Sequence, residues 1–172
     1  GRPCWFAEFT IAPPTMAKIL LDWTKNSAPR DVVRTLREAG HEAFLAGGCV
    51  RDLLLGRSPK DHDVATSATP DQVKAAFRRT VPVQPELGVT MVLWGEERLE
   101  VTTYRSEGAY LDGRRPSNVG PADAKLDVQR RDFTINGLLL DPETGEVHDH
   151  VGGLQDLENG ILRCIRDARE RF

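Results

Sequence analysis

Two neighbouring segments with alternating β-branched residues limit the folds that this chain can adopt. They are VTMVLW (89–94) and RLEVTTYR (98–105), and the turn-forming sequence Gly95-Glu96-Glu97 joins them. This pattern predicts a β-hairpin, which makes its two strands antiparallel. A doubly wound sheet, in which the strands run parallel, is therefore disfavoured.

Upstream of the hairpin, helical and extended patterns alternate. Apolar residues at helical spacing predict a helix over 29–40, and the strand EAFLAGG (42–48) leads directly into a short helix, CVRDLLLG (49–56). The segment DHDVA (61–65) is predicted as a strand. A threonine cap, a first-turn proline and a glutamine three residues after the cap predict a helix from Pro70 to Arg78.

Downstream of the hairpin, the chain returns to helices and short strands. A long loop rich in Gly, Pro, Asp and Arg is expected over 106–122, followed by a helix near 127–136. Strands are expected at LLL (138–140) and ILRCI (161–165). The fold class is therefore α/β (α+β), with a mixed, hairpin-containing sheet flanked by helices.

Length and composition suit one globular domain. The chain has 172 residues and a formal net charge of −3, so nothing global points to nucleic acid as a partner. We expect a leader or extension over 1–28, with Met16 as the natural start, and a catalytic domain over 29–172. The chain stops within a helical, charge-rich pattern, which favours a truncated product or an excised domain.

Cysteine usage and hydropathy bear on the location of the protein. The three cysteines are far apart and form no C-x-x-C pair, so neither a disulfide framework nor a zinc site is indicated. No apolar run approaches the roughly 18 residues of a membrane span. We therefore expect a cytoplasmic protein without a membrane partner. The sequence does not reveal its oligomeric state.

The pair Asp61 and Asp63 is the first candidate for chemistry. On a strand the two carboxylates share one face and His62 points to the other. Carboxylates this close repel each other unless a cation lies between them, and hard oxygen ligands suit Mg²⁺. Taken alone, the pair is weak evidence for a metal site, and a solvent-exposed polar strand end is the commoner explanation.

Two further features are candidates for the same site. The strand that ends at Gly47 and Gly48 and turns into a helix exposes backbone N–H groups to an anion such as a triphosphate, and Arg51 lies one turn into that helix. The alternative is a tight turn with Arg51 on a solvated face. Glu100 supplies a third carboxylate on a strand that can lie beside DHDVA, and it is equally compatible with an outward-facing strand residue.

Several motifs together resemble a known family. They are AFLAGGCVRDLLLGRSPKDHDVATSATPDQV, LEVTTYR, YLDGRRPSNV, RRDFTINGLLLD and DHVGGLQDLENGILRCI. In this order they resemble the catalytic head of the class II (bacterial-type) tRNA nucleotidyltransferases, the CCA-adding enzymes, and of the bacterial poly(A) polymerases. The resemblance runs from about Val33 to Phe172.

The resemblance implies template-independent transfer of CMP and AMP from CTP and ATP to the 3′ end of tRNA. It implies that Asp61 and Asp63 bind Mg²⁺. It also implies contacts with the incoming nucleotide from four residues: Gly48, Arg51, Arg131 and Asp132. From the residues alone, Arg130 and Arg131 are equally compatible with a helix-surface ion pair to Asp132, and FTIN (133–136) is expected to pack in the core.

The segment EGAYLDGRRPSNVG, which contains Arg114 and Arg115, resembles the flexible loop of CCA- and A-adding members and is the candidate RNA-contacting loop. His62 and Gln84-Pro85 depart from the family pattern. The family's base-reading element and its neck, body and tail domains are expected beyond this chain.

Two alternatives stay open. One is a poly(A) polymerase or another A-adding enzyme that acts on RNA 3′ ends. The other, from a different class of protein, is a catalytically silent nucleotide-binding module.

Overall fold

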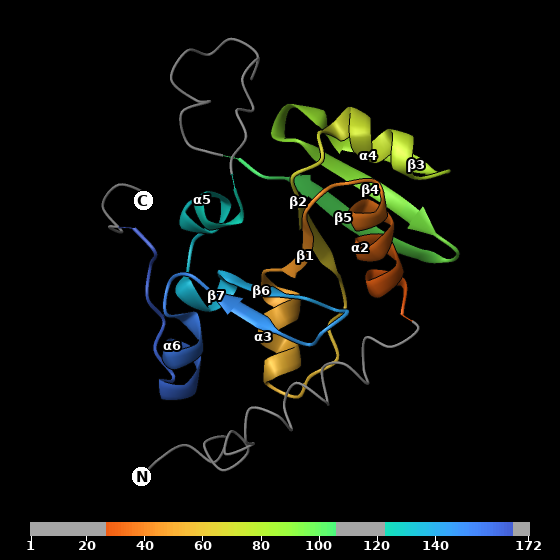
Figure 1. The fold of residues 1–172 in the computed structure, drawn as a ribbon. Coiled ribbons are helices and arrows are strands. Elements are labelled where there is room, and N and C mark those ends of the chain that lie inside the picture. Colours follow the sequence, from red (N-terminus) through yellow and green to blue (C-terminus); the bar gives the residue numbers. More distant parts are fainter. Residues whose placement is uncertain (1–26, 106–122, 167–172) are drawn as a thin grey trace, which may run out of the picture.

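A seven-stranded mixed sheet forms the centre of the computed structural model, which describes residues 27–105 and 123–166 (Figure 1). The strand order is β3-β4-β5-β2-β1-β6-β7. Neighbouring strands are antiparallel, except that β2 and β5 are parallel. The strands are β1 (Ala43–Ala46), β2 (Asp63–Thr66), β3 (Thr80–Gln84), β4 (Val89–Trp94), β5 (Glu97–Thr103), β6 (Leu138–Leu140) and β7 (Val147–Asp149). The mixed sheet and the β4–β5 hairpin are confirmed.

Side-chain caps mark the starts of some of the helices. Ser27 accepts a hydrogen bond from the Arg30 amide at the start of α2, and Thr69 forms a capping box with Gln72 at the start of α4. The α-helices are α2 (Ala28–Glu38), α3 (Gly48–Leu54), α4 (Pro70–Ala76), α5 (Ala124–Gln129) and α6 (Gly153–Asn159). Two 3-10 turns, η2 (Pro85–Leu87) and η4 (Thr134–Asn136), complete the set within the described residues.

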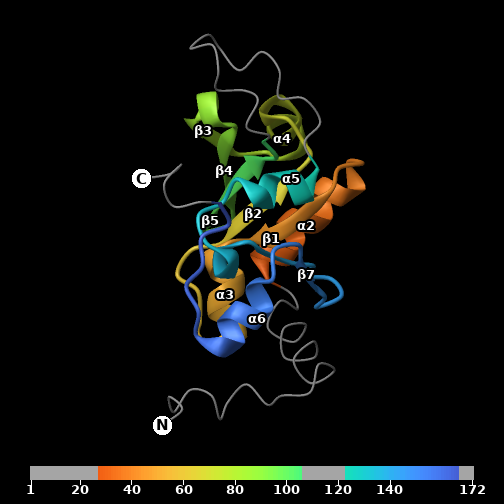
Figure 2. The same cartoon turned by 90° about the vertical axis from the view of Figure 1, so that its left-hand side faces the viewer.

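The two faces of the sheet are covered differently. Leu45, Val64 and Val101 belong to the main core, which also takes in residues of α2, α3 and α4. Ala46 and Ala65, the next residues along β1 and β2, point to the opposite face, because side chains alternate along a strand, and join a smaller cluster with α5. Figure 2 shows α5 on this second side of the sheet. The part of this face near the start of β2 carries polar residues.

The structure corrects three local predictions. The helix expected near 127–136 ends at Gln129, because Phe133 is extended and pairs with Cys164 in an isolated bridge. The segment 161–165 forms only that bridge and is not a strand. Strands β3 and β7 were not expected, since β3 contains a proline and β7 has only three residues.

Two other expectations concern membranes and domain organisation. None of the helices within 27–105 and 123–166 has both the length and the apolar character needed to cross a membrane. The division into an extension (1–28) and a catalytic domain (29–172) stays a prediction.

Candidate functional site

A carboxylate pair lies where β2 begins. Asp63, the first residue of β2, is the register partner of Glu100 in the parallel strand β5. The flanking residues Leu99 and Val101 are buried in the main core, so Asp63 and Glu100 point together to the other face. Asp63 is half-buried and Glu100 is exposed. The structure therefore brings together two of the three predicted acids by strand register.

Asp61 lies beside this pair but outside the strand. The predicted strand 61–65 begins two residues late, at Asp63, so strand alternation does not fix the directions of Asp61 and His62. Burial raises the pKa of Asp63, the charges of Glu100 and Asp61 raise it further, and Arg131 opposes the change. Burial also lowers the pKa of His62, against the charges of Glu97 and Asp61. Negative charge is thus concentrated around Asp63, which favours a cation.

The carboxylates at the start of β2 suit one mode of metal binding. Within the part of the chain that the structure describes, no group of three His, Cys, Asp or Glu side chains is arranged to hold an ion by itself. Mg²⁺ does not need such a cage, because it keeps several waters and is commonly bound by one or two carboxylates together with substrate phosphates. Asp61 and Asp63 fit that mode of binding.

Two guanidinium groups lie against the glycine turn between β1 and α3. Gly47 has φ 80° and ψ −143°, a conformation that suits glycine. A Cβ atom added at Gly47 would lie 3.2 Å from Nη1 of Arg131, and one added at Gly48 would lie 3.3 Å from Nη2 of Arg51. The predicted residues Gly47, Gly48, Arg51 and Arg131 therefore meet at one point, although they come from distant segments.

Carboxylates hold these guanidinium groups in place. Arg51 donates from Nε and Nη2 to Oδ1 of Asp52, at 3.1 and 3.0 Å. The buried carboxylate of Asp127 accepts from Nε of Arg130 at 3.0 Å and from Nη2 of Arg131 at 3.2 Å. The alternative of a helix-surface ion pair with Asp132 is not what the structure shows, since both arginines pair with Asp127. Sequence reasoning missed Asp127, and its spacing of three and four residues from the arginines was the available signal.

Asp132 lies next to the turn η4. Its Oδ1 accepts from the Phe133 amide at 2.7 Å and from Nδ2 of Asn136 at 3.2 Å. Asn136 Oδ1 in turn accepts from Nη1 of Arg51 at 2.7 Å. Asp132 is therefore linked to Arg51 through the side chain of Asn136. Arg114 and Arg115 lie outside the described residues.

A cleft of about 460 Å³ opens between α3 and the start of β2. Four predicted residues line it: Gly48, Arg51, Asp61 and Asp63. Arg57 and Lys60 line it too, and the sequence analysis did not single them out, although both lie between the glycine pair and the acids. Burial raises the pKa of the lining Cys49 thiol to about 11, so it is not a ready nucleophile. A cleft with both cationic and carboxylate walls suits a triphosphate with its metal ion.

Comparison with known proteins agrees with this geometry. Residues 43–163 match the model of the "Poly A polymerase head domain" family. The CCA-adding enzyme of Streptococcus uberis is 48% identical over 142 residues, which are 82% of this chain and 35% of that relative. The CCA-adding enzyme of Lactiplantibacillus plantarum is 47% identical over 146 residues, 84% of this chain and 36% of the relative. The chain thus spans about a third of the length of these curated relatives.

Solved structures give the same result. The CCA-adding enzyme of Bacillus stearothermophilus in complex with CTP superposes with a TM-score of 0.73 at 31% identity, covering 94% of this chain and 36% of that one. A tRNA nucleotidyltransferase complexed with a primer tRNA and an incoming ATP analog gives a TM-score of 0.64 at 32% identity, covering 78% and 39%. The family match spans most of the sequence and includes all seven strands of the described sheet. This chain belongs to the poly A polymerase head domain family.

Proposed function

We propose that this chain is the catalytic head of a CCA-adding tRNA nucleotidyltransferase, which transfers CMP and AMP from CTP and ATP to the 3′ end of tRNA. The observation that carries the proposal is the carboxylate pair Asp63 and Glu100 beside two guanidinium groups at the glycine turn. The relatives named CCA-adding enzymes and the solved complexes with CTP or with tRNA support the choice of substrates.

The cationic side of the cleft would hold the triphosphate. Arg51 and Arg131 already lie against the glycine turn, and carboxylate partners limit the motion of both guanidinium groups. Guanidinium groups bind phosphate oxygens through paired hydrogen bonds. Lys60 and Arg57 add positive charge on the same cleft. These residues would hold the α-phosphate in a fixed place for in-line attack by the RNA 3′-hydroxyl.

The acidic side would hold the metal. The family consists of nucleotidyltransferases, which are generally metal-dependent, and we propose Mg²⁺ as the ion with Asp61 and Asp63 as its ligands. When bound, the ion would neutralise charge on the phosphates and on the leaving pyrophosphate. Glu100, next to Asp63, would keep this side of the cleft negative. Chelation should abolish transfer, and added Mg²⁺ should restore it.

The substrate test uses the full-length protein. It is supplied with tRNAs that end before CCA, after the first C and after both C residues, and with each triphosphate separately. We expect C addition to the first two and A addition to the third. Asp61→Ala and Asp63→Ala should abolish incorporation, whereas the control Asp71→Ala, on the exposed start of α4, should not. Wild-type turnover by the double Asp61→Ala, Asp63→Ala variant would contradict the proposal.

The same assay separates the alternatives. Long poly(A) tails on arbitrary RNA would identify a poly(A) polymerase, to which the name of the matching family also applies. Magnesium-dependent triphosphate binding without extension of any RNA primer would identify a silent binding module. The described cysteines, Cys49 and Cys164, are free thiols, and this agrees with the cytoplasmic location that we propose.

A further inference from the structure

Asn136 joins the two sets of residues proposed to contact the nucleotide. Its Oδ1 accepts from Nη1 of Arg51 at 2.7 Å, and its Nδ2 donates to Oδ1 of Asp132 at 3.2 Å. A guanidinium group only donates and an ionised carboxylate only accepts, so these partners fix the orientation of the amide. Asn136 and Arg51 are 85 residues apart in the sequence. The bonds therefore connect α3 with the segment that follows α5.

The bond from Arg51 completes its anchoring. Asp52 accepts from Nε and Nη2 of Arg51, and Asn136 accepts from the remaining terminal nitrogen, Nη1. The guanidinium plane is thereby held from two directions beside Gly48. A long side chain that is already fixed loses less conformational entropy when a ligand binds. Among the described residues, loss of Asn136 would leave Arg51 only the acid beside it in the sequence.

The neutral charge of the amide also matters. Asp52 already offsets the charge of Arg51, with which it forms an ion pair at 3.0 Å. A second carboxylate at position 136 would make this group net negative and would also repel Asp132. The uncharged amide anchors Arg51 without weakening the attraction between Arg51 and phosphate.

We propose that Asn136 is a positioning residue for nucleotide binding, which fixes Arg51 and Asp132 relative to each other without adding negative charge. The inference rests on the proposed function, because it treats Arg51 and Asp132 as contacts of the incoming nucleotide. It revises the expectation that FTIN packs only as core. Thr134 is buried, but Asn136 is half-buried and bonds to residues of the site.

Two substitutions separate anchoring from charge. Asn136→Leu keeps a similar volume and removes both hydrogen bonds, and Asn136→Asp keeps an acceptor for Arg51 but adds charge beside Asp132. In the full-length protein with Mg²⁺, we expect Asn136→Leu to raise the KM and the Kd for CTP about tenfold, with a much smaller change in kcat. Asn136→Asp should weaken CTP binding more than Asn136→Leu does, and added salt should reduce the difference between the two variants. The matched controls, Asn159→Leu and Asn159→Asp at the exposed end of α6, should leave KM unchanged.

A double-mutant cycle tests whether Asn136 acts through Arg51. In an Arg51→Gln background, Asn136→Leu should raise the Kd for CTP by less than about twofold, because the group that it positions is gone. Independent, multiplicative effects of the two substitutions would overturn the inference. So would a lower thermal midpoint for Asn136→Leu with an unchanged KM, which would indicate a purely structural role. Failure of the proposed function looks different, since the wild type itself would then bind no CTP, and this result would overturn both.

Discussion

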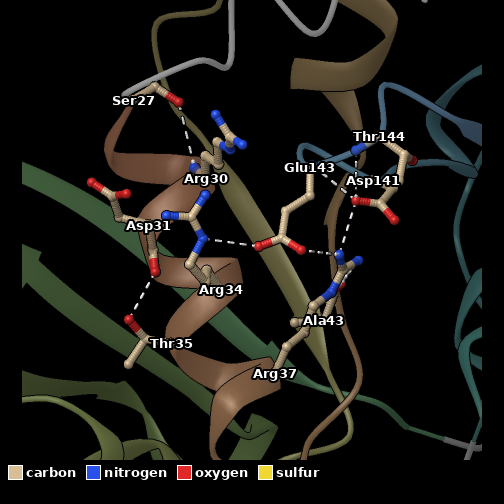
Figure 3. Close-up of polar contacts among 10 residues, drawn as sticks. All are labelled: Ser27, Arg30, Asp31, Arg34, Thr35, Arg37, Ala43, Asp141, Glu143 and Thr144. Atoms are coloured by element: carbon tan, nitrogen blue, oxygen red, sulfur yellow. Dashed lines mark hydrogen bonds and ion pairs between the residues drawn. The ribbon is translucent and has the colours of Figure 1, made fainter.

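Two regions of this fold in which arginine and carboxylate groups gather differ in what those charges do. Beside α2, Arg37 donates to the Ala43 carbonyl at 3.2 and 2.8 Å and to Asp141 at 2.9 Å, while Arg34 pairs with Glu143 at 3.1 Å (Figure 3). We call this set the α2 network. At the cleft, in contrast, Asp63 lies beside another acid, Glu100.

The pKa values of two aspartates show the contrast. Burial alone would raise the pKa of Asp141, but hydrogen bonds from Arg37 and from the Glu143 amide outweigh it, so the pKa lies below its usual value. At Asp63, burial and the charges of neighbouring acids raise the pKa despite Arg131. An ionised Asp141 therefore stabilises the fold, whereas an ionised Asp63 destabilises it. The α2 network stabilises the fold, whereas the negative charge around Asp63 at the cleft is not fully neutralised by the protein and is available to a ligand.

The same substitution in both regions gives the largest expected effect. Asp63→Asn should lower CMP transfer by at least about a thousandfold, because a proposed metal ligand is lost. It should leave the free energy of unfolding unchanged or raise it, since a repelled charge is removed. Asp141→Asn should retain transfer and lose about 1 kcal/mol of stability. Primer extension and urea denaturation measure the two quantities, and a large loss of stability in Asp63→Asn would contradict the contrast.

A glycine substitution tests the cationic side of the cleft. Gly47→Ala should cost about 1–3 kcal/mol through backbone strain and should weaken triphosphate binding about tenfold, because its Cβ would lie 3.2 Å from Arg131 Nη1. Gly56→Ala is the control. Gly56 has φ +72° with nothing within 4 Å of an added Cβ. Gly56→Ala should therefore lower the stability without weakening triphosphate binding. Calorimetric titration with CTP distinguishes them, and equal binding by both variants would argue against a role for Arg131.

Within the α2 network, two arginines should differ in their contributions. Arg37→Gln should lower the free energy of unfolding by about 2 kcal/mol, because it frees the Ala43 carbonyl and Asp141. Arg34 has a side chain that is 44% exposed, so Arg34→Gln should cost less than about 1 kcal/mol. Urea denaturation measures both, and similar costs would show that burial does not set the value of these ion pairs.

The smallest effect depends on pH. Because the pKa of Asp141 is lowered in the folded state, its contribution is fully present above the unfolded value of about 4 and is lost as pH falls through the folded pKa. The stability difference between the wild type and Asp141→Asn, about 1 kcal/mol at pH 7, should therefore shrink below pH ~4. A difference that persists in acid would show that the charge of Asp141 is not its source.

Local patterns predicted the elements better than they predicted their contacts. The hairpin, the capped helix α4 and the turn at Gly47 were predictable, because each depends on neighbouring residues. The position of Glu100 beside Asp63 was one of two alternatives that the sequence left open. The anchoring of Arg131 by Asp127 and of Arg51 by Asn136 was not expected, since tertiary structure brings these side chains together.

The error at ILRCI has a similar cause. The segment has the composition of a strand, but Leu162 is 66% exposed. Its backbone bonds to the turn around Phe133 only through Arg163 and Ile165, while the Ile161 amide bonds back to Asp156 of α6. A strand needs a partner along its length, and composition does not reveal whether the sheet offers one.

The parallel register of β2 and β5 has an evolutionary consequence. Slipping β5 by one residue would turn Glu100 toward the core and bring Leu99 and Val101 to the cleft. The alignment that lets the chain fold is thus also the one that pairs the acids. A mutation that changed this alignment would disturb both the fold and the acid pair. Insertions in either strand should therefore be selected against, even where every proposed ligand is retained.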